Sequence, residues 1–215
     1  MVKTAVLVSG GGANLQAILD ANIFGELGSC ELTAVLSSVP DVYALTRAHA
    51  ANIPAFVVDA VTFPNRASFT EAVIRKLTEL KIELVVLAGF RHYLEIQFFR
   101  AFRGKVITTY PSLVPAFYDA EISNMPNSSF LACSAALDFG CRCTGASSLL
   151  IDDEPSQGLI ILQKSVEIKS ADNPATLQRR IMEEAEWDIL VNSIRLFCDG
   201  KLTISGKKTV ISDMA

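Results

Sequence analysis

Short apolar runs recur along the first half of this 215-residue chain, and a stretch of helical periodicity follows each of the first four. The runs lie at residues 4–8, 32–36, 55–58, 84–87 and 106–109. Continuous Val-, Ile- and Leu-rich runs of this length are typical of strands buried on both faces of a parallel sheet. Their alternation with helices predicts an α/β fold, in which a mostly parallel, Rossmann-like sheet is flanked by helices.

The second half of the chain breaks the strict alternation. Strands are expected there at residues 147–150 and 160–166, helices at 130–139 and 174–198, and a closing hairpin at 202–211. No repeat, linker or low-complexity tract separates the two halves. We therefore expect residues 1–215 to form a single domain.

Composition excludes several classes of partner. The formal net charge of −4 offers no basic patch, so no nucleic-acid partner is expected. The longest apolar run, residues 84–90, is too short to span a bilayer, and no membrane partner is expected. The five cysteines are an odd number without a disulfide framework, which favours free thiols and a cytoplasmic protein. Cys141 and Cys143 are read as alternate residues of a strand rather than metal ligands, because no second pair with zinc spacing lies nearby.

A glycine-rich turn joins the first predicted strand to the first helix. Glycine lets the backbone approach a ligand closely, and the first N–H groups of a helix attract an anion. The turn is therefore a candidate phosphate site, although a tight connection between strand and helix also needs glycine for steric reasons alone. The candidate phosphate-binding residues are Gly10, Gly11, Gly12, Ala13 and Asn14.

A β-branched run followed by two prolines marks the end of the fifth predicted strand. Residues 107–117 read Ile-Thr-Thr-Tyr-Pro-Ser-Leu-Val-Pro-Ala-Phe. This segment resembles the I-N-x-H-P-S-L-L-P-x-F signature of the phosphoribosylglycinamide (GAR) formyltransferases, folate-dependent enzymes of purine biosynthesis. The resemblance implies catalytic positions at Thr108 and Tyr110, where the signature has Asn and His.

Four further segments carry the same resemblance. The glycine turn is similar to the family's S-G-x-G-S-N, which holds the phosphate of GAR. Residues 144–163 follow T-G-x-T-V-H-F-V…D-x-G-x-I-I-L-Q, with Ser156 in the place of the catalytic Asp. Glu186 matches a glutamate that borders the substrate ribose. Residues 87–94 resemble L-A-G-F-M-R-I-L, a loop that grips the folate, although they also suit a plain turn before a helix. The resemblance thus implies folate contacts at Gly89, Phe90, Arg91, His92 and Leu94.

The resemblance also implies a division of roles, with residues 1–105 as a nucleotide- or phosphate-binding half and 106–215 as a catalytic and folate half. The family reaction transfers a formyl group from 10-formyltetrahydrofolate to the amine of GAR, a small phosphorylated ligand. Because Thr108, Tyr110 and Ser156 replace the three catalytic side chains, we expect an impaired or inactive homologue, a pseudoenzyme, that keeps phosphate-ligand binding. A functional GAR formyltransferase with unusual residues and a regulatory or interaction protein stay open as alternatives. A homodimer also stays open.

Overall fold

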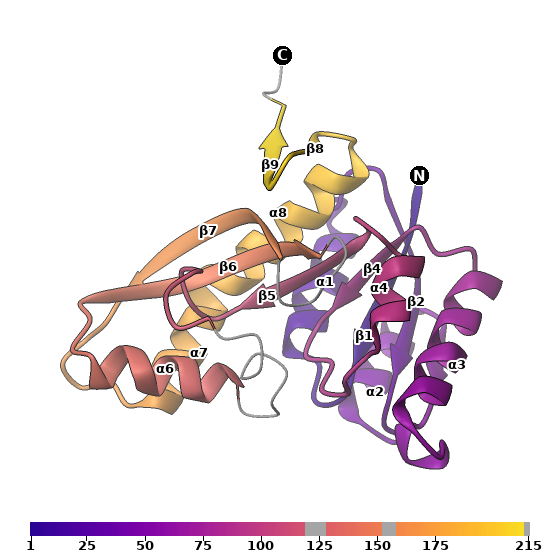
Figure 1. Cartoon of the computed structure of the whole chain (residues 1–215), viewed down its shortest axis with the longest axis horizontal. Helices are drawn as coiled ribbons and strands as arrows, with labels where there is room; N and C mark the ends of the chain where they lie inside the picture. The colour runs from indigo at the N-terminus through magenta and orange to yellow at the C-terminus, as the bar shows by residue number, and fades with distance from the viewer. Residues whose placement is uncertain (119–127, 152–157, 213–215) are drawn as a thin grey trace.

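A seven-stranded sheet lies at the centre of the computed structural model, which describes residues 1–118, 128–151 and 158–212 (Figure 1). The strand order is β3-β2-β1-β4-β5-β6-β7. Strands β1 to β5 are parallel to one another, and β6 and β7 run antiparallel to their neighbours. The predicted α/β fold with a mostly parallel sheet is confirmed.

The elements follow the predicted order, with boundaries shifted by a few residues. The strands of the main sheet are β1 (Val2–Val8), β2 (Cys30–Ser37), β3 (Ala55–Val57), β4 (Leu84–Leu87), β5 (Val106–Tyr110), β6 (Cys143–Ile151) and β7 (Leu159–Glu167). The α-helices are α1 (Ala13–Ile23), α2 (Tyr43–Ala50), α3 (Arg66–Glu79), α4 (Ile96–Ala101), α6 (Ser128–Asp138), α7 (Pro174–Ile181) and α8 (Trp187–Cys198). A 3-10 turn η1 (Ala60–Thr62), a π-helical turn η3 (Met182–Glu186) and the hairpin β8 (Leu202–Ser205) and β9 (Lys208–Ile211) complete the described elements.

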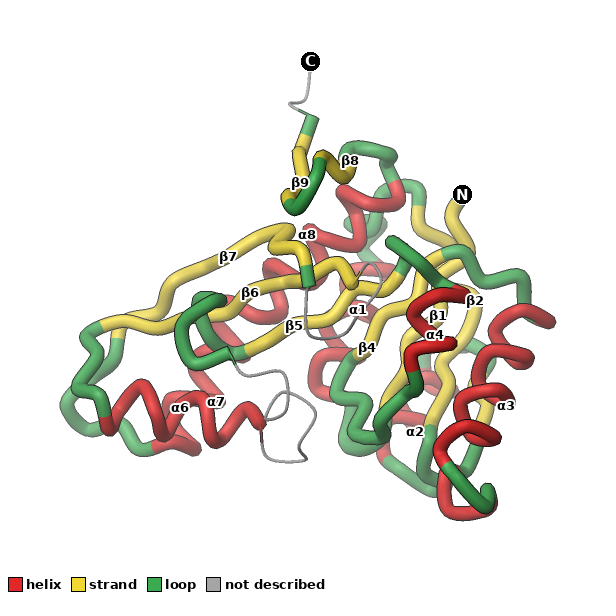
Figure 2. The backbone as a smooth tube through the Cα atoms, viewed as in Figure 1, coloured by secondary structure: helices red, strands yellow, loops and turns green. Residues whose placement is uncertain are grey.

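The alternating side chains of β1 build two separate cores, one on each face of the sheet. Val6 and Val8 belong to the core formed with α1, α2 and α8, whereas Ala5 and Leu7 belong to the core formed with α3 and α4. All four side chains are fully buried. Figure 2 shows where these helices lie around the sheet. Burial on both faces explains why β1 is a continuous apolar run in the sequence and not an alternating one.

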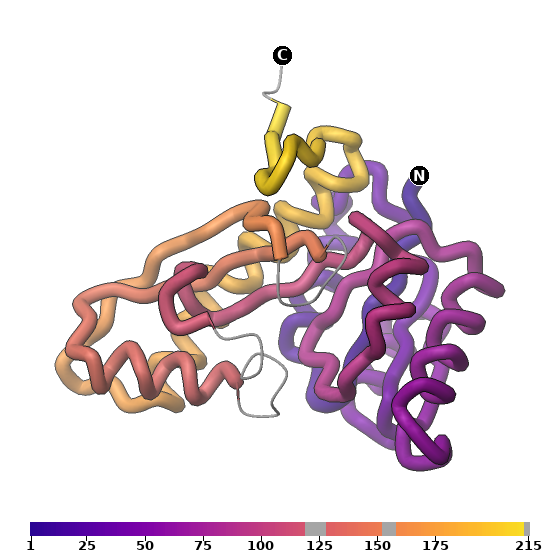
Figure 3. Tube along the Cα trace, in the orientation of Figure 1, coloured from indigo at the N-terminus to yellow at the C-terminus, as the bar shows by residue number. Residues whose placement is uncertain are grey.

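The second half of the chain extends the sheet beyond β5. Helices α6 and α7 pack along the long antiparallel pair β6–β7, around a small third core that includes Cys133, Leu177 and Ile181 (Figure 1). The closing hairpin lies beside β7, and its Thr209 hydroxyl donates a hydrogen bond of 2.5 Å to the carbonyl of Ile160 (Figure 3). None of the helices within the described residues is long and apolar enough to cross a membrane.

The predicted helix of residues 174–198 is not one continuous α-helix. It begins as expected, because the Asn173 side chain caps it by accepting hydrogen bonds from the N–H groups of Ala175 and Thr176. The π-helical turn η3 then separates α7 from α8. Such turns insert an extra residue, which changes the direction of the side chains that follow, and they occur often at functional sites.

The cysteine prediction needs one correction. Because β6 begins at Cys143, Cys141 precedes the strand and the two residues are not alternate positions of one strand. Both are free thiols. Within residues 1–118, 128–151 and 158–212, no group of three or more His, Cys, Asp or Glu side chains is arranged to hold a metal ion.

Candidate functional site

A pocket of about 880 Å³ opens at the carboxyl ends of β1, β4 and β5. Between β1 and β4 the strand order reverses direction, and α/β sheets place their ligands at such switch points. The volume lies in the upper part of the range for small-molecule sites, about 300–1,000 Å³. Lining residues come from the glycine turn, α2, the β4–α4 loop, the carboxyl ends of β5 and β6, the start of α6, and the α7–η3 segment.

The glycine turn lines the pocket, and its hydrogen bonds leave several N–H groups unused. All three of its glycine carbonyls already accept hydrogen bonds from elsewhere. The Gly10 carbonyl accepts from Ala44 N–H at 3.2 Å, and the Gly11 carbonyl accepts from Arg47 Nε at 2.9 Å. The Gly12 carbonyl accepts from Gln16 N–H at 2.9 Å. Among the described residues, none accepts a hydrogen bond from the N–H groups of residues 11–14. A turn that offers donors at the start of α1, with its carbonyls turned away, is suited to an anion.

Gly12 is required for a reason other than close approach to a ligand. Its φ of +73° is in the left-handed region, which favours glycine. A Cβ atom at this position would lie 2.8 Å from the Cβ of Ala44 on α2. The missing side chain therefore makes room for α2, whereas a Cβ on Gly11 would meet nothing within 4 Å.

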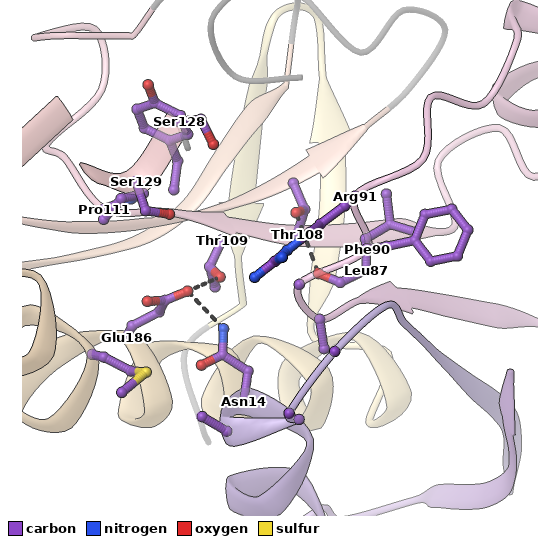
Figure 4. Close-up of a pocket in the computed structure, with 18 of the residues that line it drawn as sticks. Asn14, Leu87, Phe90, Arg91, Thr108, Thr109, Pro111, Ser128, Ser129 and Glu186 are labelled. Atoms are coloured by element: carbon purple, nitrogen blue, oxygen red, sulfur yellow. Dashed lines mark hydrogen bonds between the residues drawn. The ribbon is translucent and has the colours of Figure 1, made fainter. Parts of the chain in front are cut away.

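Glu186 lies on the pocket wall in a network of polar side chains (Figure 4). Its Oε1 accepts hydrogen bonds from the Thr109 hydroxyl at 2.5 Å and from Asn14 Nδ2 at 2.7 Å. The Asn14 carbonyl oxygen in turn accepts a bond from the Trp187 indole N–H at 3.1 Å. The network joins the glycine turn, β5 and the π-helical turn, so it holds together three segments that are distant in sequence.

Burial raises the pKa of the Glu186 carboxyl above its usual range. The hydrogen bonds from Thr109 and Asn14 act in the opposite direction, because they stabilise the carboxylate, but the loss of solvation outweighs them. A carboxyl group with a raised pKa that faces a pocket is a typical feature of functional sites.

The two catalytic positions predicted on β5 lie in the pocket wall, on the opposite face of the strand from Thr109. The Thr108 hydroxyl points to the Leu87 carbonyl of the neighbouring strand, 3.4 Å away (Figure 4). The buried Tyr110 hydroxyl donates a hydrogen bond of 3.1 Å to the carbonyl of Phe117, and its ring packs edge-on against Tyr118. Tyr110 thus ties the segment that follows β5 to the strand. Ser156, the third predicted position, lies outside the described residues.

The β4–α4 loop is anchored by two buried hydroxyl groups. Ser9 Oγ and Ser38 Oγ lie 2.6 Å apart, the Arg91 N–H donates to Ser9 Oγ at 2.9 Å, and His92 Nδ1 lies 2.8 Å from Ser38 Oγ. Of the predicted folate contacts, Gly89, Phe90, Arg91 and His92 line the pocket. Leu94 does not line it, because its side chain is buried in the core with α3 and α4.

Several lining residues were absent from the sequence prediction. Thr109, the partner of Glu186, could have been found from strand alternation, since it occupies the other face of β5 from Thr108. Arg47 on α2 lies outside any recognised motif, and the sequence carries no signal that brings it to the glycine turn. The same holds for other lining residues, among them Tyr43, Ser128, Ser129, Phe130, Gln178 and Met182.

Comparison with known proteins identifies the group to which this fold and pocket belong. The sequence profile of the family described as formyl transferase matches residues 2–194. A phosphoribosylglycinamide formyltransferase from Haemophilus influenzae is 32% identical over 204 residues, which cover 95% of this chain and 91% of that protein. The chain belongs to the phosphoribosylglycinamide formyltransferase family.

Solved structures of this formyltransferase family have the same architecture. Glycinamide ribonucleotide transformylase 1 from Symbiobacterium toebii superposes with a TM-score of 0.89 and 34% sequence identity, covering 99% of this chain and 95% of that one. The trifunctional purine biosynthetic protein adenosine-3 of Gallus gallus is 32% identical over 203 residues. The match covers 94% of this chain but only 19% of that protein, so the chain spans about a fifth of that trifunctional relative's length.

Proposed function

We propose that this chain is a phosphoribosylglycinamide formyltransferase homologue that binds a GAR-type ligand but transfers the formyl group poorly or not at all. The ligand's phosphate would lie on the N–H groups of residues 11–14, and its ribose hydroxyls against Glu186. Both contacts use groups that are already held in place. Hydrogen bonds to its carbonyls hold the turn, and hydrogen bonds from Thr109 and Asn14 hold Glu186. In this assignment residues 1–105 supply most of the phosphate site and residues 106–215 the catalytic positions.

The pocket also has features that suit the folate-derived formyl donor of the family reaction. The loop from Gly89 to His92 offers backbone groups, and the side chains of Phe90, Leu149 and Ile151 supply an apolar wall for a flat ring. We assign the backbone groups of this loop and the three apolar side chains to the donor, 10-formyltetrahydrofolate, which when bound supplies the formyl group.

Formyl transfer makes demands that the described residues meet poorly. The amine nitrogen must form a bond to the formyl carbon while the bond from that carbon to folate N10 breaks. A proton must leave the amine, and N10 must gain one. Negative charge develops on the formyl oxygen during the transfer. The family signature supplies an Asn donor and a His next to this oxygen.

The observation that carries the proposal is the engagement of both signature positions in structural contacts. The Tyr110 hydroxyl is directed at the Phe117 carbonyl and the Thr108 hydroxyl at the Leu87 carbonyl, so neither points a donor to a reacting group. A tyrosine hydroxyl, with an ordinary pKa of about 10, also exchanges protons poorly at neutral pH. Losing a general acid–base group typically costs about 10²–10⁴-fold in rate, and losing one oxyanion donor about 10²–10³-fold.

A functional formyltransferase with unusual residues is the second candidate, and one observation favours it. Glu186 and His92 are titratable side chains that line the pocket and are held by hydrogen bonds. Either could accept the proton of an attacking amine if the ligand lay within reach. The two candidates differ in turnover and agree on ligand binding.

The test therefore measures binding and turnover on the same preparation. Calorimetry with GAR and with ribose 5-phosphate measures binding, and tetrahydrofolate release from 10-formyltetrahydrofolate in the presence of GAR measures transfer. We expect both ligands to bind and turnover to stay far below about 1 s⁻¹, the lower end for ordinary enzymes. Turnover near that value would favour the second candidate, and no heat or thermal shift at millimolar ligand would refute both.

A further inference from the structure

Arg91 is positioned over the glycine turn by its own backbone. Its N–H donates to Ser9 Oγ, and Ser9 immediately precedes the turn. Ser9 and Ser38 are both buried, with 7% and 0% of their surface exposed, so this anchor is part of the protein interior. The next residue, His92, is held through its side chain instead, whose Nδ1 lies 2.8 Å from Ser38 Oγ. The position from which the Arg91 side chain leaves the backbone is therefore fixed.

The Arg91 side chain extends into the pocket toward the turn. Its Nη2 lies 4.0 Å from the place that a Cβ atom would occupy on Gly10. In Figure 4 it projects from the β4–α4 loop into the space between Thr108 on β5 and Asn14 on α1. A guanidinium group at this place faces the same space as the free N–H groups of the turn.

The guanidinium of the second arginine near the turn, Arg47, is already occupied by contacts within the protein. Arg47 donates through Nε to the Gly11 carbonyl and through Nη1 to Gln16 Oε1, and its guanidinium stacks on Tyr43. Its hydrogen bond to the Gly11 carbonyl holds the backbone of the turn in place. For the Arg91 guanidinium, in contrast, no acceptor is found among the described residues. An arginine without a protein acceptor, beside a cradle of N–H groups, matches the geometry of a bound oxyanion.

We propose that the Arg91 side chain binds the phosphate group of the phosphorylated ligand, together with the N–H groups of the turn, and does not serve the folate donor. The family signature L-A-G-F-M-R-I-L has an apolar Met at this position, so the cation would be an addition in this chain. It would increase affinity for the dianionic form of a phosphate monoester. This inference rests on the proposed ligand site and adds a specificity-determining residue to it.

The decisive variants are Arg91→Met, which places the signature's residue there, and Arg91→Lys, which keeps the charge but loses the two-pronged geometry. Arg100→Met is the matched control, because Arg100 is an exposed arginine on α4 that does not line the pocket. The probes are ribose 5-phosphate and tetrahydrofolate, each titrated calorimetrically at low and at physiological salt. Thermal unfolding of each variant first checks that its fold is intact.

We expect Arg91→Met to weaken ribose 5-phosphate binding by about 10- to 100-fold, the range for losing a hydrogen bond between two charged groups. Its binding should also depend less on salt, while Arg91→Lys falls between it and the wild type. Tetrahydrofolate affinity should stay within about twofold, and Arg100→Met should match the wild type.

Three results would overturn the assignment, and the first two are distinguishable from the third. Unchanged ribose 5-phosphate affinity in Arg91→Met, or a loss confined to tetrahydrofolate, would refute the role of Arg91 and leave the proposed function standing. Absence of ribose 5-phosphate binding by the wild-type protein would refute the proposed function and the role of Arg91 together.

Discussion

Replacing Tyr110 by Phe separates a structural role of its hydroxyl group from a catalytic one. The substitution keeps the ring and its edge-on contact with Tyr118, whose ring centre is 4.9 Å away, and removes the bond to the Phe117 carbonyl. A neutral hydrogen bond of this kind contributes about 0.5–1.5 kcal/mol to stability. For a chain of 215 residues, about 1 kcal/mol corresponds to a decrease in Tm of about 2–4 °C.

The assay is thermal unfolding of Tyr110→Phe beside Tyr43→Phe. Tyr43 is the control because 60% of its surface is exposed, so loss of its hydroxyl should change Tm by less than 1 °C, a shift of about a few tenths of a kcal/mol. We expect Tyr110→Phe to melt earlier than the wild type and to leave any residual formyl transfer unchanged. An unchanged Tm combined with a loss of transfer would refute our reasoning, because it would make the hydroxyl catalytic.

Two further substitutions test the turn and the carboxyl network. Gly12→Ala should lower the free energy of unfolding by about 2 kcal/mol or more, because the backbone is left-handed there and the new Cβ would contact Ala44. Gly11→Ala is the control and should change stability little. Equal melting temperatures for the two variants would contradict this reasoning. For Glu186, a pKa raised on folding means that its contribution to stability is present at low pH and is lost as the pH rises through the folded-state value. The Tm of Glu186→Gln relative to the wild type should therefore increase from pH 4 to pH 8 in the absence of ligand, and a difference that stays constant with pH would contradict the raised pKa.

The sequence predicted the scaffold well because its signals are local. The fully buried run of β1 and the alternation of short apolar runs with helices each follow from residues close in sequence. The π-helical turn was missed because the apolar stripe of residues 174–198 continues through it. No propensity distinguishes such a turn from an α-helix.

The sequence suggested site residues only where they lie in a motif of the resemblance. The glycine turn, Thr108, Tyr110 and Glu186, to which the resemblance assigned roles, line one pocket; those roles stay predictions. The resemblance did not reveal that Tyr110 bonds to Phe117, because that contact depends on how the segment after β5 folds back. Arg47 likewise reaches the turn only through the packing of α2 against it, which no local pattern encodes. Leu94 matched the motif and yet belongs to the core.

The rate of formyl transfer in a single turnover tests the central claim most directly. Excess protein is mixed with 10-formyltetrahydrofolate and GAR, and release of tetrahydrofolate is followed for the wild type and for the triple variant Thr108→Asn, Tyr110→His, Ser156→Asp. Our account predicts that transfer by the wild type stays far below about 1 s⁻¹, the rate of an ordinary enzyme, and that transfer by the triple variant also stays below that rate. Transfer by the wild type at that rate would contradict the account, whatever the triple variant does.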